Sequence, residues 1–140
     1  MTDSRGELLK PEQARQLVEL AEQARRSLSQ FAGQPVQFNA SGLQLLDEWI
    51  ERTPFPSKPL QVLWVAFTGE VFRRRHSGEW AVYRDDGQRL VVLCPTERGD
   101  LHPVEVARQV SRRIANGIAD SLALFYVQES VLLHEREDIA

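Results

Sequence analysis

The stretch from residue 60 to residue 95, LQVLWVAFTGEVFRRRHSGEWAVYRDDGQRLVVLCP, decides the fold. It opens with apolar side chains that recur at helical spacing: Leu60, Leu63, Trp64, Phe67 and Val71. Further apolar residues flank this stripe, so we expect a central helix that is covered on more than one side. Gly69 inside this helix costs about 1 kcal/mol relative to alanine. We therefore expect it to permit close approach by another stretch of backbone.

Two short runs in the second half of this stretch predict a β-hairpin. Residues 79–85 (EWAVYRD) and 89–94 (RLVVLC) are rich in β-branched and aromatic side chains. Asp86 and Gly87 lie between them, and this pair of residue types tolerates the positive φ angles of a tight turn. We expect an antiparallel hairpin that packs against the preceding helix.

Apolar patterns on both sides of this stretch predict four more helices. They span about residues 11–32, 41–53, 103–116 and 122–134. The stripe of the first helix must cover its own domain or a partner. We expect Pro103 at the first position of its helix, where the missing N–H costs nothing. The last segment is an unbroken apolar run that helix and strand both explain, and its length favours a helix.

These elements predict one α+β domain, with helices packed around a small antiparallel sheet centred on the hairpin. Residues 1–10 are expected to form a flexible N-terminal arm, residues 11–135 the single globular domain, and residues 136–140 a charged tail. A chain of 140 residues can bury enough surface to fold without a disulfide or a metal.

Composition excludes several classes of protein. The single cysteine, Cys94, rules out an intramolecular disulfide and a multi-cysteine zinc site, and favours a cytoplasmic address. The polar start MTDSRGELLKPEQ is unlike a signal peptide. Polar residues interrupt the longest apolar run, so we expect no membrane span. A net charge of -3 argues against a general nucleic-acid binder.

The sequence offers no specific catalytic or metal-binding motif. Cys94 with His76, His102 or His134 is the one conceivable thiol–imidazole pair, but the cysteine ends an apolar strand, where an inert buried thiol is common. The histidines share no metal-ligand spacing. We therefore assign no catalytic residue, no metal ligand and no cofactor, and the sequence gives no reason to name an enzyme activity.

Charged and aromatic side chains near the central helix are the candidates for binding. Glu70 flanks the apolar stripe, and a buried carboxylate would need a partner, for which we expect Arg112. Arginines of two predicted helices could converge on one surface: Arg73, Arg74, Arg75, Arg108, Arg112 and Arg113. The other explanation is a solvated face matched by glutamates. The candidate binding residues are Glu70, Arg74, Arg75, Trp80, Tyr83, Arg108 and Arg112.

Three short motifs between Trp64 and Phe125 resemble a family of bacterial domains of unknown function. They are a helix ending in Gly-Glu (residues 69–70), a Gly-x-Trp that opens a hairpin (residues 78–80), and a helix segment from Pro103 to Gly117. The resemblance covers a little under half of the chain and implies a helix–hairpin–helix core. It implies no catalytic or binding residue.

The function that best fits this sequence is that of a non-enzymatic protein-interaction domain of the adaptor, chaperone or immunity type. Its partner would be another protein or a second copy, bound at the sheet face or the first helix. The alternative is a binder of a phosphorylated ligand or RNA through the arginines.

Overall fold

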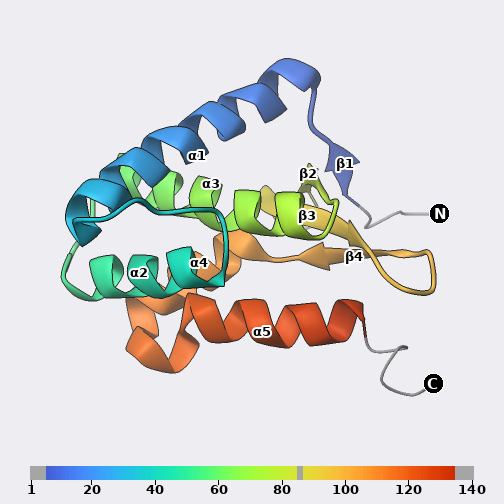
Figure 1. Ribbon diagram of the computed structural model, residues 1–140. Helices are drawn as coiled ribbons and strands as arrows, with labels where there is room; N and C mark the ends of the chain where they lie inside the picture. Colours follow the sequence, from blue (N-terminus) through green and yellow to red (C-terminus); the bar gives the residue numbers. More distant parts are fainter. Residues whose placement is uncertain (1–5, 85–86, 135–140) are drawn as a thin grey trace.

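A computed structural model describes residues 6–84 and 87–134 (Figure 1). These residues form one α+β domain. Its elements are β1 (Glu7–Leu8), α1 (Pro11–Ala32), α2 (Ala40–Glu51), α3 (Lys58–Arg75), β2 (Glu79–Tyr83), β3 (Arg89–Pro95), β4 (Leu101–Val104), α4 (Val106–Asn116), the 3₁₀ helix η1 (Gly117–Asp120) and α5 (Leu122–Leu133). None of the described helices has the length and apolar character that a membrane span requires.

Helix α3 is the centre of the molecule, as its sequence predicts. Ser57 is the N-cap of the helix, and its hydroxyl accepts a hydrogen bond from the Leu60 N–H. Trp64, Phe67 and Phe72 are fully buried. Helix α1 packs along one side of α3 and the sheet lies against another (Figure 1).

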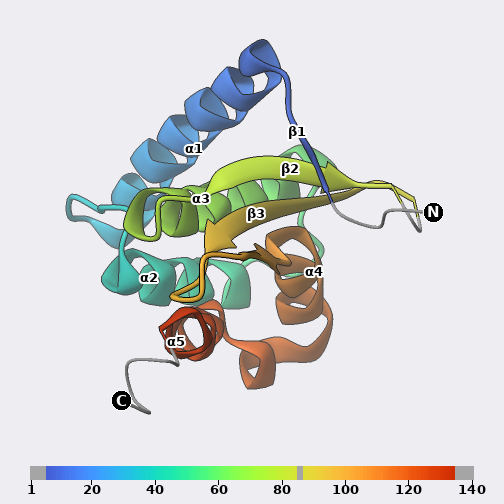
Figure 2. The same ribbon diagram turned by 90° about the vertical axis from the view of Figure 1, so that its right-hand side faces the viewer.

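The hairpin prediction is confirmed. Strands β2 and β3 pair antiparallel with Trp80 opposite Val92, and the sheet order is β1-β2-β3-β4. The predicted turn falls partly on residues 85 and 86, which lie outside the described residues. In Figure 2, β2 and β3 lie in front of α3 and no helix lies in front of them, so helices cover one face of the sheet.

The sheet contains two strands that sequence reasoning missed. Residues 1–10 were expected to form a flexible arm, but Glu7 and Leu8 pair with β2. Pro103 was expected to begin a helix, but it lies in β4, opposite Leu93 of β3. Proline is tolerated in an edge strand because the ladder needs no N–H on its free side. Helix α4 begins three residues later, at Val106.

The last apolar run is a helix, which resolves the ambiguity in its sequence. The Ser121 hydroxyl accepts a hydrogen bond from the Leu124 N–H and begins α5. Helix α5 packs mainly against α2 and lies on the opposite side of the molecule from α1 (Figure 1). The tail at residues 136–140 lies outside the described residues.

Candidate interaction surface

Glu70 is buried, but its partners differ from the expected one. Its carboxylate accepts hydrogen bonds from Arg73 Nε and Nη2 at 2.6 and 2.9 Å and from Arg74 Nε at 2.9 Å. The Trp80 indole N–H donates a fourth bond at 2.9 Å. The expected pairing with Arg112 is wrong, because Arg73 and Arg74, one turn further along α3, bind the carboxylate instead.

These four hydrogen bonds keep the Glu70 carboxylate ionised. Burial alone would raise the pKa of Glu70, but the hydrogen bonds from Arg73, Trp80 and Arg74 outweigh it and hold the pKa below its ordinary value. A carboxylate that stays ionised and accepts four bonds is poorly suited to act as a general base. Glu70 therefore fixes the end of α3 against the hairpin.

Trp80 faces the core and not solvent. Its side chain is nearly fully buried, and its ring packs over Gly69 of α3. The expected use of Gly69 is thus corrected: the missing side chain admits an indole ring and not a second backbone. A role for Trp80 at a binding surface does not fit this position.

The six arginines do not form one surface. Arg73 and Arg74 are engaged with Glu70, and Arg75 is exposed beside them at the end of α3. That end adjoins the start of β2. Helix α4 begins at the other end of the hairpin, where Glu105 pairs with Arg89 at 3.0 Å.

The α4 arginines themselves face in different directions. Arg108 and Arg112 are exposed, whereas Arg113 points into the molecule and is 1% exposed. These six arginines therefore do not supply the expected cluster for a phosphate or RNA site.

The outer face of the sheet is buried at its centre and open toward its borders. Tyr83 lies on this face and lines a groove of about 680 Å³ together with Leu8, Leu93 and Leu101. Ala81 and Val91 at its centre are buried, and the most exposed apolar side chains, Leu8 and Leu101, lie on the edge strands β1 and β4. The stripe of α1 is likewise buried against α3, so it leaves no apolar face for a partner.

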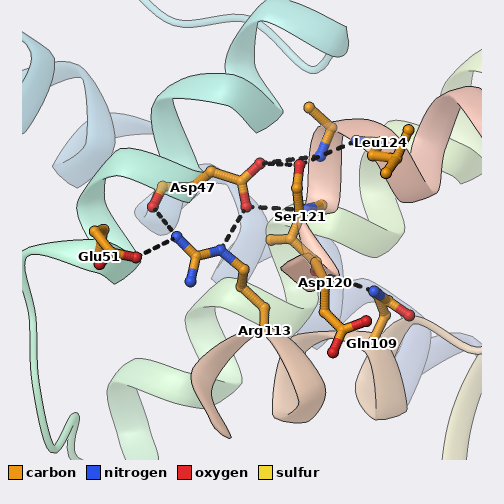
Figure 3. Close-up of polar contacts among 9 residues, drawn as sticks. Asp47, Glu51, Gln109, Arg113, Asp120, Ser121 and Leu124 are labelled. Atoms are coloured by element: carbon orange, nitrogen blue, oxygen red, sulfur yellow. Dashed lines mark hydrogen bonds and ion pairs between the residues drawn. The ribbon is translucent and has the colours of Figure 1, made fainter. Parts of the chain in front are cut away.

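A buried polar network ties α2, α4 and α5 together (Figure 3). The Asp47 carboxylate accepts a hydrogen bond from Arg113 Nε at 2.9 Å, across a sequence separation of 66 residues. Arg113 Nη2 donates to the Asp47 carbonyl and to Glu51, each at 2.9 Å. Both charges of the central pair are thus compensated inside the protein, as burial demands.

The same carboxylate fixes the start of α5. Asp47 accepts hydrogen bonds from the Ser121 hydroxyl and from the Leu122 and Ala123 N–H groups, at 2.9 to 3.0 Å. A negative charge at a helix N-terminus satisfies free N–H groups and favours the helix dipole. Asp47 therefore sets which face of α5 is turned outward.

That outward face of α5 is largely apolar and bears no charge, and Gln128 is the polar residue exposed on it. Leu124, Val127 and Val131 are 50%, 54% and 55% exposed and follow one another at helical spacing. Leu132 and Ile118 extend the exposed apolar area at the two ends of the helix. The whole of α5 carries one charged residue, Glu129, and this side chain turns inward to bond His102 at 2.8 Å. We call the five apolar side chains the α5 surface.

Sequence reasoning did not identify the α5 surface. The run from Leu122 to Leu133 contains one charged residue, and this signal was available in the sequence. A helix with so few charged residues is normally buried, so the exposure of Leu124, Val127 and Val131 makes this surface a candidate for binding.

Three histidines anchor the C-terminal half of α5. His76 Nε2 bonds the Ser130 hydroxyl at 2.9 Å, His102 bonds Glu129, and His134 Nδ1 bonds Glu97 at 3.0 Å. Burial, followed by the charges of His134 and Arg75, lowers the pKa of His76. The folded protein therefore favours the neutral form of the His76 imidazole.

We expect His76 to make the protein less stable in mild acid. Its folded pKa lies below the ordinary 6.5, so the unfolded chain binds the proton more readily. Its contribution is complete above that value and is lost as the pH falls through the folded pKa. Urea unfolding should show a smaller loss of stability between about pH 8 and about pH 5 for His76→Gln than for the wild type. An identical loss in both proteins would show that His76 plays no part.

Cys94 is not an accessible nucleophile, although it has triad-like neighbours. It lies opposite His102 in the sheet, and His102 bonds Glu129. The thiol is fully buried, and burial, reinforced by the Glu129 charge, raises the pKa of Cys94 to about 12. Such a thiol stays protonated at neutral pH and is a weak nucleophile.

No protein-family model, curated protein or solved structure matches this chain. The resemblance to bacterial domains of unknown function therefore stays a prediction.

Proposed function

We propose that this protein is a non-enzymatic protein-interaction domain that docks its partner on the α5 surface. The observation that carries the proposal is the exposure of Leu124, Val127 and Val131 on a helix whose outer face bears no charge. Interface centres in other proteins are depleted of charge in the same way. The sheet face and α1 support docking less well, because their central apolar residues are already buried.

The scaffold beneath this surface suits a binding role. The Asp47–Arg113 pair fixes one end of α5, and the histidine contacts fix the other. A surface held rigid before binding loses less conformational entropy when the partner arrives. The adaptor, chaperone and immunity classes all fit such a surface, and the arginine-based alternative has no comparable observation in its favour.

A photo-crosslinking amino acid at position 127 tests the proposal in the cells that make the protein. We expect a crosslink to a protein at this position and none when the same amino acid replaces exposed Glu19 on α1. The additional change Leu124→Glu should abolish the crosslink. Because Leu124 is half exposed, that change should cost no more than about 0.5 kcal/mol of stability.

Two outcomes would contradict the proposal. One is equal crosslinking at positions 127 and 19. The other is a crosslink at position 127 that persists in the Leu124→Glu variant while its thermal unfolding matches that of the wild type.

A further inference from the structure

The α5 surface adjoins an acidic groove at its N-terminal end. The groove has a volume of about 500 Å³, and its apolar part includes Ile118 and Ala123. Glu48 and Glu51 line it from α2, and the Glu51 side chain is 64% exposed although it bonds Arg113. The one cation in the lining, Arg113, is buried and already paired with Asp47. This end of the surface is therefore negative toward solvent.

The C-terminal end of the surface carries charges of both signs among the described residues. Leu132 lines a hollow of about 190 Å³ together with Glu97, Arg98 and Asp100. His134 contacts Glu97 at 3.0 Å. The charge that can select a partner therefore lies at the N-terminal end of the stripe, beside Glu48 and Glu51.

This charge arrangement discriminates between two occupants. A second copy that packed its α5 against this surface would bring no lysine or arginine from that helix to Glu48 and Glu51, because α5 contains neither residue type. A helix with apolar residues at i, i+3 and i+7 and flanking cations would match both the stripe and the acidic groove. The matching ridges of two helices also suit the spacing of Leu124, Val127 and Val131.

We propose that the occupant of the α5 surface is an amphipathic helix of a partner protein, with an apolar stripe flanked by lysine or arginine, and not a second copy of this chain. This inference rests on the proposed function and adds the chemistry of the partner. The basic residues near the N-terminal end of α5 meet Glu48 and Glu51, and the apolar stripe covers the exposed side chains of α5.

Two synthetic, alanine-rich helical peptides provide the test. Both carry the same leucine stripe, and one has lysine flanks while the other has glutamate flanks. We expect fluorescence anisotropy to show about tenfold tighter binding of the lysine peptide at low salt, because two or three ion pairs each contribute modestly. About 1 M salt should remove most of the difference.

Charge reversal in the groove sharpens the test. Gln44→Lys with Glu48→Lys changes two exposed α2 side chains and leaves the Asp47–Arg113–Glu51 contacts in place. This pair should reverse the preference between the peptides. The matched control, Gln16→Lys with Glu19→Lys, makes the same chemical changes on exposed α1 and should leave the preference unaltered.

The outcomes separate this inference from the proposed function. Equal binding of both peptides, abolished by Leu124→Glu, would overturn the basic-helix inference and leave the α5 docking surface intact. Sedimentation showing a dimer that Leu124→Glu dissolves would do the same, because a second copy would be the occupant. Binding of neither peptide would also overturn the inference, whereas the crosslinking result decides the proposed function separately.

Discussion

Asp47→Asn is expected to lower the free energy of unfolding by about 3 kcal/mol, the lower end of the usual cost of removing one partner from a buried ion pair. Arg113 is 1% exposed and loses the buried carboxylate, although its bonds to Glu51 and to the carbonyl of residue 47 remain. Asparagine also presents an NH₂ group where the carboxylate had accepted bonds from the start of α5. At least one donor would then face another donor.

Urea unfolding of Asp47→Asn measures this cost, and Glu48→Gln provides a control. Glu48 is the next residue on α2 but is exposed, so its neutralisation should change stability by less than about 0.5 kcal/mol. In the Asp47→Asn background, Arg113→Met should cost much less than in the wild type, because the stranded charge is gone. A loss below about 1 kcal/mol for Asp47→Asn would show that the pair is not essential to the fold.

Gly69→Ala is expected to destabilise the protein by about 2 kcal/mol, although alanine favours a helix. The gain in helix propensity is about 1 kcal/mol. A β-carbon at position 69 would overlap with the Trp80 ring, which is buried and bonded to Glu70. Overpacking of a well-filled core typically costs 1–3 kcal/mol and sometimes more, so the clash outweighs the propensity.

A double-mutant cycle isolates the clash at Gly69. The smaller ring in Trp80→Phe should leave room for the new methyl group, so Gly69→Ala should cost less in that background. Thermal unfolding of the four proteins gives the interaction energy directly. Additive effects of the two changes would contradict the packing argument.

The elements that were predictable from sequence are those specified by their own residues. Helix α3 and the hairpin carry clear periodicity, and their prediction is confirmed. Strand β1 contains two residues, and Pro103 in β4 is also a typical helix-starting residue. Both strands exist because a neighbouring strand pairs with them, and a short sequence does not reveal its neighbour.

The candidate site also has parts that were predictable from sequence and parts that were not. The burial of Glu70 followed from its place beside an apolar stripe, but the choice among several arginines depended on side-chain reach. The Asp47–Arg113 pair joins residues 66 positions apart, and no local pattern indicates it. Prediction of the α5 surface would have required knowing which side of a largely apolar helix the rest of the chain covers.

Pro103 has a consequence for how molecules of this protein can meet. The free edge of β4 lacks one backbone N–H donor, because Pro103 has none. At the opposite edge of the sheet, the described part of β1 is two residues long. Within the described residues, an incoming strand from a neighbouring molecule meets only a short or interrupted row of donors and acceptors at these edges, and this disfavours fibril-like growth. Concentrated solutions should accordingly resist amyloid-type aggregation, even though an apolar helix is open to solvent.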